Sequence, residues 1–366
     1  MKKFQNKNIL VTGSCGTVGS ELVRQLLNQE VYGVKRLVGL DNNESGLFFQ
    51  DQKHLDDHRA SFYICDIRDE NHLIEKMSGI DVVFHCAALK HVILCERSPE
   101  QAIETNINGV RNVISAAKKN NVETVIFTSS DKAVNPTNVM GTTKLMGERL
   151  ITSANSSKHL GGPIFASTRF GNVIGSSGSV VPIFHNQIKS GGPVTVTHQD
   201  MTRFVMSVEE SVELVINSAM QAKGGEVFVT KMPVLRIVDL AKSLIEELSS
   251  GYGYKPCDIR INYIGIKPGE KLYEELMSDE EMPRSVELEN YFSILPAFRG
   301  IYSDIDYKYD NLTSDSVTNP YISANEACLT VKEITKLLRL YNLLGSANTG
   351  ETSRYWPGDK ESVKDE

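Results

Sequence analysis

The feature of this sequence that most constrains its fold is a regular alternation of short apolar runs and amphipathic segments. The apolar runs are predicted strands, and they cover residues 8–12, 36–40, 61–65, 81–86, 124–128 and 164–169. Segments with helical periodicity lie between them, including residues 21–27 and 99–120. Nearly continuous apolar strands that alternate with helices are typical of a parallel sheet covered on both faces, with right-handed crossovers. The sequence therefore predicts an α/β fold with a Rossmann-like, doubly wound parallel sheet.

Composition excludes several classes of function. The chain has 39 lysines and arginines against 46 aspartates and glutamates, which gives a formal net charge of −7. This balance argues against sequence-independent nucleic-acid binding, which needs cations that face phosphates. No apolar run approaches the ~20 residues of a membrane helix, and the six scattered cysteines form no C-x-x-C pair. We therefore expect a cytoplasmic protein without a membrane segment, a nucleic-acid partner or a metal site.

The first predicted turn has the glycine spacing of a phosphate-binding loop. Gly13, Gly16 and Gly19 form a G-x-x-G-x-x-G pattern between the first strand and the first helix. Such glycines permit a tight turn, a close approach of the backbone to a pyrophosphate and close packing of helix on strand, and the helix N-terminus attracts phosphate. The other loop residues predicted to bind the cofactor are Ser14, Thr17 and Val18.

A carboxylate at the end of the second predicted strand indicates which dinucleotide binds. Asp41 stands 22 residues after Gly19, and no arginine follows it closely. An acidic side chain there accepts hydrogen bonds from a ribose 2′-hydroxyl and repels a 2′-phosphate, so NAD is predicted over NADP. Asp66, after the third strand, is a candidate for the adenine end of the cofactor, and an ordinary turn aspartate is an equal interpretation.

The rhythm of the sequence changes after the sixth predicted strand. Residues 171–193 are punctuated by glycine and proline, and a further helix is predicted over residues 208–221. We predict an NAD-binding domain over residues 1–170 and a substrate lobe over residues 171–343, with elements that return to the first domain. Residues 344–366 are polar and turn-rich, so we expect a flexible tail there.

Polar residues follow the fifth predicted strand, at the edge where open parallel sheets bind ligands. Ser130, Asp131 and Lys132 end that strand, and Lys144 lies on the helix that follows. Taken separately, Asp131 and Lys132 would be a solvated pair, and Met140 would be core filling. Their joint position behind a dinucleotide loop favours a catalytic site.

Several segments resemble a known family. The glycine loop, the polar cluster and the lysine on the next helix are similar to those of the extended short-chain dehydrogenase/reductases. Within that superfamily the chain resembles the nucleotide-sugar 4,6-dehydratases of polysaccharide biosynthesis, whose best-known members act on UDP-N-acetylglucosamine. The resemblance covers roughly residues 7–343, and its characteristic segments are residues 85–92, 105–109, 130–141, 169–173 and 268–271.

These residues permit a reaction in which one hydride is recycled. NAD⁺ takes hydride from C4 of the sugar, which acidifies the hydrogen on C5, and the hydride returns at C6 after water has left. Neutral Lys132 is expected to remove the C5 proton, while protonated Asp131 helps the C6 hydroxyl to depart. We expect burial, Lys144 and the positive nicotinamide ring to lower the pKa of Lys132.

The sequence departs from the family pattern at two positions. The usual Tyr-x-x-x-Lys reads Met140-x-x-x-Lys144, so the phenolate base is absent. Asp131, or a route through Ser129 or Ser130, is the candidate for taking the O4 proton, and Lys144 is implied to bind the nicotinamide ribose. Lys267 stands where an arginine is usual and can face a phosphate as a point charge.

The resemblance also implies the remaining contacts. Ile67, Ala87 and Ala88 are expected at the cofactor, whereas Lys90 is expected at the sugar or the cofactor phosphates, or is a surface lysine. The nucleotide diphosphate and its ribose are expected to contact Asn172, Ser179, Val180, Arg203, Lys267 and Glu270. Arg203 suits this role best, because a guanidinium binds paired phosphate oxygens.

Three functions are open at this point. The leading one is a 4,6-dehydratase, a lyase that makes a 4-keto-6-deoxy sugar nucleotide for surface polysaccharide and acts as a homo-oligomer. The second is a 4-epimerase or reductase on the same scaffold, which has less need of Asp131 and Lys132 side by side. The third is a non-catalytic NAD-binding sensor, which only the missing tyrosine favours.

Overall fold

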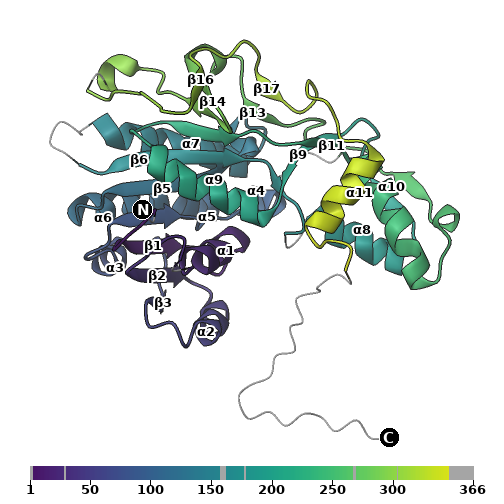
Figure 1. The fold of residues 1–366 in the computed structure, drawn as a ribbon, viewed down its shortest axis with the longest axis horizontal. Coiled ribbons are helices and arrows are strands. Elements are labelled where there is room, and N and C mark those ends of the chain that lie inside the picture. Colours follow the sequence, from purple (N-terminus) through teal and green to yellow (C-terminus); the bar gives the residue numbers. More distant parts are fainter. Residues whose placement is uncertain are drawn as a thin grey trace, which may run out of the picture.

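A large, mostly parallel sheet forms the centre of the molecule (Figure 1). The computed structural model describes residues 3–28, 30–156, 162–176, 179–266, 269–302 and 304–345. Within these residues the ten strands of the sheet lie in the order β16-β14-β15-β10-β6-β5-β4-β1-β2-β3. The parallel strands are β1 (Asn8–Thr12), β2 (Arg36–Asp41), β3 (Ala60–Ile64), β4 (Val82–His85), β5 (Thr124–Ser130), β6 (Ile164–Phe170) and β10 (Val227–Thr230). The order β3-β2-β1-β4-β5-β6 is that of a doubly wound sheet, so the predicted fold class is confirmed.

Helices cover both faces of this sheet. Side chains alternate along β1, so that Ile9 and Val11 enter one core cluster and Leu10 enters another. On the first face lie α1 (Thr17–Leu26) and α9 (Val208–Gln221), and on the second lie α3 (Glu70–Lys76), α6 (Gly109–Lys119) and α7 (Val139–Ser153). The other helices of this part are α2 (Glu44–Lys53), α4 (Val92–Arg97) and α5 (Pro99–Ile103).

The helix predicted over residues 99–120 contains a widened turn. A π-helical turn over Glu104–Asn108 separates α5 from α6. The side-chain amide of Asn106 in this turn is buried, accepts the N–H of Leu89 at 2.8 Å, and donates to Leu89 O and Thr143 Oγ1 at 3.0 Å each. π-Turns inside α-helices are frequent at functional sites. Here the turn ties the loop after β4 to α7.

Residues after β6 form a second lobe and also extend the large sheet. The lobe is built around α8 (Val180–Lys189), α10 (Ile237–Leu248) and α11 (Val331–Leu340), which lie together beyond the sheet (Figure 1). Its small sheets pair β8 (Val194–Val196) with β12 (Ile261–Tyr263), and β9 (Thr202–Met206) with both β7 (Asn172–Val173) and β11 (Val234–Arg236). Strand β13 (Glu275–Met277) pairs with β17 (Tyr321–Ile322). The strands β14 (Ser285–Leu288), β15 (Tyr291–Ile294) and β16 (Leu312–Ser314) extend the large sheet beyond β10.

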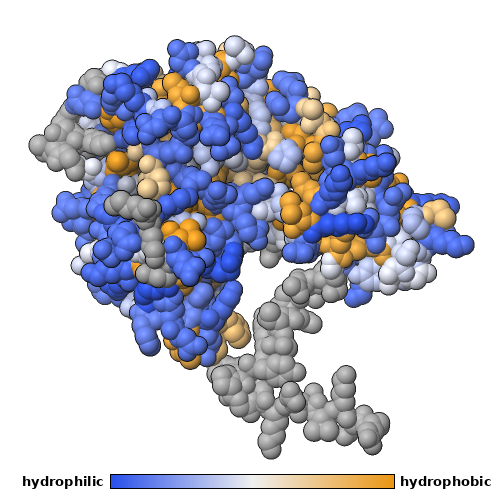
Figure 2. Space-filling model, viewed as in Figure 1, coloured by the Kyte–Doolittle hydropathy of each residue, from blue (hydrophilic) through white to orange (hydrophobic). Residues whose placement is uncertain are grey.

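The surface differs between the two parts of the molecule. Figure 2 shows a mostly hydrophilic surface over the large sheet, while apolar side chains gather near β9, β11 and the neighbouring helices of the lobe. In the part of the chain that the structure describes, no helix has the length and apolar character needed to cross a membrane. The predicted flexible tail falls almost entirely on residues 346–366, which lie outside the described residues.

Candidate active site

The glycine loop after β1 has the geometry that its spacing predicts. Gly13 has a φ of +68°, and a Cβ atom there would lie 2.7 Å from the backbone nitrogen of Ala87. A Cβ on Gly19 would overlap the carbonyl oxygen of Gly13, so only glycine lets α1 pack this closely. At Gly16 a Cβ would meet only Gly13 O, at 3.3 Å, and would otherwise project into open space in front of α1.

The start of α1 fits a dinucleotide phosphate. Gly16 is the N-cap residue of α1, and no side chain accepts a hydrogen bond from the first turn of the helix. That turn, which begins with Thr17 and Val18, also holds no acidic residue, so its backbone N–H groups are suited to bind phosphate. Ser14 is fully buried, and its hydroxyl lies 3.0 Å from where a Cβ of Gly39 would stand. The side chain of Ser14 therefore faces β2, and its backbone is already engaged, since its N–H donates to Leu40 O at 3.1 Å and its carbonyl accepts Gln50 Nε2 at 2.9 Å.

Asp41 lies at the end of β2 beside this loop. Its carboxylate accepts the N–H of Cys15 at 2.9 Å and that of Asn43 at 3.0 Å. The acidic group thus stands directly against the glycine loop, as the sequence predicts for a carboxylate that receives a ribose hydroxyl. The open space at Gly16, the uncapped helix and this carboxylate together fit NAD, and its binding by these residues stays a prediction.

The other predicted cofactor residues differ in their surroundings. Ala87 follows β4, donates its N–H to Thr12 Oγ1 at 3.3 Å and touches the glycine loop, and Ala88 comes next in the same stretch. Asp66 pairs with Arg68 at 2.5 Å, which leaves both interpretations of Asp66 open. Ile67 is buried in the core under α6, and Lys90 is exposed in the loop after β4.

The end of β5 brings the central catalytic candidates together. Lys132 Nζ lies 3.1 Å from both carboxylate oxygens of Asp131, and Ser130 Oγ donates to Asp131 Oδ1 at 2.6 Å. The Asp131 side chain is 6% exposed and that of Lys132 is 34% exposed. The structure therefore places a nearly buried carboxylate in contact with an amine that can still be reached from outside.

The expected direction of the Lys132 pKa is wrong. Burial alone would lower the pKa of Lys132, but the carboxylates of Asp131 and Glu274 raise it above its ordinary value. Asp131 is the larger of these two effects, and Glu274 comes near Lys132 only through the fold of the chain.

Gly141 is a site residue that the sequence reasoning passed over. A Cβ atom at Gly141, on the first turn of α7, would overlap the backbone carbonyl of Lys132. Only glycine allows α7 to approach the turn that carries Asp131 and Lys132 this closely. Gly141 lies within the 130–141 segment that supports the family resemblance. Its position along the chain, however, does not show that a glycine is required there.

Lys144 and Met140 lie one turn apart on α7, in different surroundings. Lys144 Nζ donates to Thr128 O at 2.9 Å and stands 4.7 Å from the ring centre of Phe127, and burial lowers the pKa of Lys144 to about 8. Met140 is 3% exposed and packs in a small apolar cluster with Cys95 and Ala102. A direct role of Met140 in the reaction stays a prediction.

A cavity of about 330 Å³ in the lobe collects most of the predicted substrate residues. Its wall includes Asn172, Ser179, Val180, Arg203 and Glu270, together with apolar residues such as Phe184 and Val196. The hydroxyl oxygen of Ser179 is buried and has no hydrogen-bond partner among the described residues. Lys267 lies outside the described residues, and Lys90 is not part of the cavity wall.

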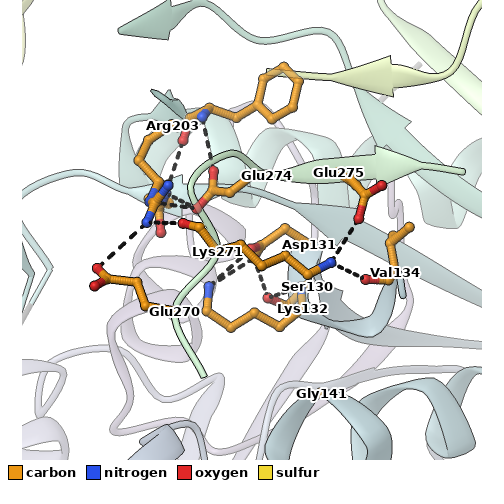
Figure 3. Close-up of polar contacts among 12 residues, drawn as sticks. Ser130, Asp131, Lys132, Val134, Gly141, Arg203, Glu270, Lys271, Glu274 and Glu275 are labelled. Atoms are coloured by element: carbon orange, nitrogen blue, oxygen red, sulfur yellow. Dashed lines mark hydrogen bonds and ion pairs between the residues drawn. The ribbon is translucent and has the colours of Figure 1, made fainter. Parts of the chain in front are cut away.

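Arg203 on β9 is held in the wall of this cavity by a dense set of contacts. Its nitrogens donate to Thr202 O at 2.8 Å and Lys271 O at 2.9 Å. It also pairs with Glu274 at 3.3 Å and Glu270 at 3.6 Å (Figure 3). The guanidinium is thus fixed at the cavity with carboxylates on two sides.

Glu274 is a second site residue that the sequence reasoning missed. Its carboxylate accepts Asn172 Nδ2 at 2.6 Å and the N–H of Phe204 at 3.0 Å. Burial and the nearby Asp131 raise the pKa of Glu274 to about 7, against the opposing effects of Arg203 and Lys132. Glu274 stands next to Glu275 in a charged run, so no signal in the sequence separates the buried carboxylate from its neighbour.

One segment of the lobe connects the cavity to the turn after β5. Lys271 Nζ donates to Val134 O at 3.0 Å and to Glu275 at 2.7 Å (Figure 3). Asn135 Nδ2 also donates to Glu275, at 3.3 Å. Residues 269–275 therefore contact both the turn after β5 and, through Glu270 and Glu274, the arginine of the cavity.

Comparisons with known proteins agree with this architecture. A protein of Bacillus thuringiensis, Pen, has a solved structure that matches with a TM-score of 0.84 and 39% identity, over 93% of this chain and 99% of that one. An uncharacterized membrane protein of Methanocaldococcus jannaschii is 50% identical over 80% of this chain and 87% of its own length. A UDP-glucose 4-epimerase of Rickettsia canadensis is 36% identical over 93% of this chain and 97% of its own.

The family assignment follows from an extended match. Residues 9–296 match the polysaccharide biosynthesis protein family. The matched stretch runs from the second residue of β1 to beyond β15 and includes the whole site described above. With its glycine loop, doubly wound sheet and lysine on α7, the chain belongs to this family of extended short-chain dehydrogenase/reductases.

Proposed function

We propose that this protein is an NAD-dependent nucleotide-sugar 4,6-dehydratase of polysaccharide biosynthesis. Its substrate would be UDP-N-acetylglucosamine, and its product a UDP-4-keto-6-deoxy-N-acetylhexosamine. The observation that carries the proposal is the contact of Lys132 with both oxygens of the nearly buried Asp131 at the end of β5. Elimination of water needs a base for C5–H and an acid for the leaving hydroxyl, and this pair can supply both.

The glycine loop and Asp41 would hold NAD at the carboxyl edge of the sheet. When bound, NAD supplies the acceptor for hydride from C4 and the donor of hydride to C6. Asp41, already at the loop through the N–H of Cys15, would accept the ribose hydroxyls. Lys144 would reach the nicotinamide ribose, and its pKa of about 8 lets the amine change its charge near neutral pH.

The Asp131–Lys132 pair holds the one proton that both roles require. In the ligand-free protein the raised pKa of Lys132 keeps this proton on the amine. Transfer along the 3.1 Å contact to Asp131 gives a neutral amine, which removes the C5 proton, and a carboxylic acid, which protonates the departing C6 hydroxyl. Ser130 steadies Asp131 during both steps through its 2.6 Å hydrogen bond.

The O4 proton needs another acceptor, because Met140 cannot ionise. Ser129 is 3% exposed, and its hydroxyl has no partner among the described residues. A buried hydroxyl without a partner is unfavourable unless a ligand completes it. Ser129 is therefore our candidate for passing the O4 proton onward, with Asp131 as the alternative acceptor.

The cavity in the lobe would receive the nucleotide diphosphate. Arg203 offers a guanidinium to the phosphate oxygens, and Ser179 offers a hydroxyl that is otherwise without a partner among the described residues. Lys267, on the same segment as Glu270, would add a point charge. The apolar part of the wall then suits the flat faces of a nucleotide base.

A 4-epimerase is the second candidate, and the Rickettsia relative of that name supports it. Epimerisation at C4 returns the hydride to the carbon from which it came. It therefore needs no base for C5–H and no acid for the C6 hydroxyl. The paired Asp131 and Lys132 would then have no task, which is why dehydration is preferred.

Mass spectrometry of the reaction separates these activities. Purified protein with UDP-N-acetylglucosamine deuterated at C4 should release one water without added reductant, and the deuterium should appear at C6. Product of unchanged mass with altered retention would favour the epimerase, and no turnover on any nucleotide sugar would favour a sensor. Label that never reaches C6 in the dehydrated product would contradict the hydride path.

We also propose that the protein is a homo-oligomer. Ile93 and Leu94 of α4, Ile103 of α5 and Met146 of α7 are exposed on helices that contact one another. A second copy of the chain could cover these apolar side chains. Sedimentation equilibrium should therefore give a mass above that of one chain, and Ile93→Asp should lower it; a monomer in the wild type would contradict this proposal.

A further inference from the structure

Glu274 lies where the cavity and the catalytic turn meet, and the proposed reaction gives it no task. Glu274 is 4% exposed, and one of its carboxylate oxygens accepts the N–H of Phe204 at 3.0 Å. The other oxygen accepts Asn172 Nδ2 at 2.6 Å and lies 3.3 Å from Arg203 Nε. A buried carboxylate thus fixes both the amide and the guanidinium that form part of the cavity wall.

The charges that face Glu274 come from two further elements. Arg203 approaches from β9, while Asp131 and Lys132 act from the turn after β5. Glu270, on the same segment as Glu274, contacts the other side of Arg203 at 3.6 Å. Two cations and three carboxylates therefore share this region before any ligand arrives. A nucleoside diphosphate would add at least two negative charges at Arg203. The buried carboxylate of Glu274 would then lose much of the stabilisation that it receives from the positive charge of Arg203.

We propose that Glu274 is a positioning residue that holds Arg203 in the cavity wall and takes up one proton when a nucleoside diphosphate binds there. This inference rests on the proposed function only in assigning the diphosphate to Arg203. The phosphate oxygens replace Glu274 Oε1 as a partner of the guanidinium, and a proton from the solvent forms an O–H bond on that carboxylate. Nothing is oxidised or reduced, and the other oxygen can still accept the N–H of Phe204.

Protonation of Glu274 also alters the catalytic pair. In the empty protein the Glu274 carboxylate is one of the groups that raise the pKa of Lys132. A neutral Glu274 no longer does so, and the amine of Lys132 then gives up its proton more readily. Diphosphate binding would thus remove one of the two carboxylates that raise the pKa of Lys132, which favours transfer of its proton to Asp131.

Calorimetric titration of the full chain with UDP tests this proposal. The heat of UDP binding is measured at pH 7.5 in Tris, HEPES and PIPES, whose ionisation enthalpies differ. The slope of this heat against the ionisation enthalpy of the buffer gives the number of protons that the complex takes up. We expect an uptake on the order of half a proton per UDP in the wild type. We expect almost none in Glu274→Gln, and unchanged uptake in Glu275→Gln, whose carboxylate pairs with Lys271.

Two outcomes of the titration would contradict the proposal. Equal uptake in wild type and Glu274→Gln would assign the proton elsewhere, and UDP that does not bind at all would remove the diphosphate from Arg203. If Glu274→Gln does not fold, infrared difference spectra of the wild type replace it. A protonated carboxylic acid should then appear on UDP binding, and its absence would overturn the inference. UDP cannot be dehydrated, so an inactive protein with Glu274-dependent uptake would contradict the proposed reaction alone.

Discussion

The protein contains two clusters of buried charge, and they behave differently. In the closed cluster, Arg169 uses all five of its N–H donors on Glu148, Glu281 and the carbonyl of Leu276, at 2.6–3.0 Å. In the open cluster, Asp131, Lys132, Arg203 and Glu274 meet at the cavity wall, and Lys132 remains 34% exposed.

The difference shows how the number of partners decides whether a buried carboxylate titrates near neutral pH. Burial alone would raise the pKa of Glu281, but its contacts with Arg169 lower it to about 2. Glu274 is buried as deeply, yet its guanidinium partner is shared with Glu270 and Asp131 lies near, and its pKa rises to about 7. Both arginines face two carboxylates, but Arg169 gives four of its hydrogen bonds to them. Arg203 donates mainly to backbone carbonyls and meets Glu274 through one contact of 3.3 Å, so it compensates that carboxylate less.

The largest expected effect comes from opening the closed cluster. Arg169→Met leaves two buried carboxylates without their cation, and we expect the free energy of unfolding to fall by about 3–5 kcal/mol. Urea unfolding followed by circular dichroism measures this change. As a control, Arg236→Met removes an exposed partner of Asp239 and should cost less than about 1 kcal/mol. Equal losses in the two variants would erase the distinction between the clusters.

The open cluster should respond mainly in activity. Lys132→Met removes the proposed C5 base, and we expect turnover to fall by about 10²–10⁴-fold. Since the nearly buried Asp131 also loses a partner, the free energy of unfolding should fall by about 1–3 kcal/mol, less than in Arg169→Met. Exchange of C5–H with deuterated water, followed by NMR, should stop as well. Lys231→Met is the matched control, because Lys231 pairs with Glu287 at similar exposure, 32%, outside the site. Wild-type exchange in Lys132→Met would remove Lys132 from its role.

Glu274 should make stability depend on pH. Its pKa of about 7 in the folded protein lies above the ordinary value of 4.5, so the folded state binds the proton more tightly than the unfolded state. This stabilisation is present below pH 4.5 and is lost as the pH rises through about 7, with a loss on the order of 1–3 kcal/mol. Glu274→Gln should lack that decline in urea unfolding at pH 5 and pH 8, whereas Glu275→Gln should keep it. A decline of equal size in Glu274→Gln would assign it to another group.

The smallest effect is expected at Met140, which belongs to neither charged cluster. Met140→Leu conserves volume in an apolar contact with Cys95 and Ala102, so stability should change by less than about 1.5 kcal/mol. Steady-state assays should show turnover within about threefold of the wild type, because a thioether carries no proton in the proposed reaction. A loss of a hundredfold would mean that the sulfur positions the sugar directly.

The parts that sequence reasoning could predict are those encoded by contiguous residues. The strand over residues 8–12 and the helix over residues 208–221 were predicted with the bounds that the structure has. Hydrophobic periodicity reports which face of an element is buried, so it finds such elements directly. The bounds of the other strands differ by one or two residues, because the last pairs of a strand depend on its neighbours.

The site residues also fall into those that local sequence predicts and those that it does not. Gly13 and Asp41 have a local signature, since a turn and the end of a strand require their residue types. Gly141 and Glu274 do not, because what fixes them is a contact made across the fold, with Lys132 O in one case and with Asn172 and Arg203 in the other. The pKa of Lys132 combines the two cases, because it is raised first by the adjacent Asp131 and then by Glu274, a carboxylate 142 positions later in the chain.

The π-turn over Glu104–Asn108 restricts how this chain can change in length. Deleting one residue there would restore a regular α-helix, yet it would rotate everything before the cut by about 100° relative to α6. Asn106 would then point away from Leu89 and Thr143, and the loop after β4 would lose its anchor on α7. Natural insertions and deletions, and any chimaera built by recombination, should therefore avoid this turn and fall in the surface loops of the lobe.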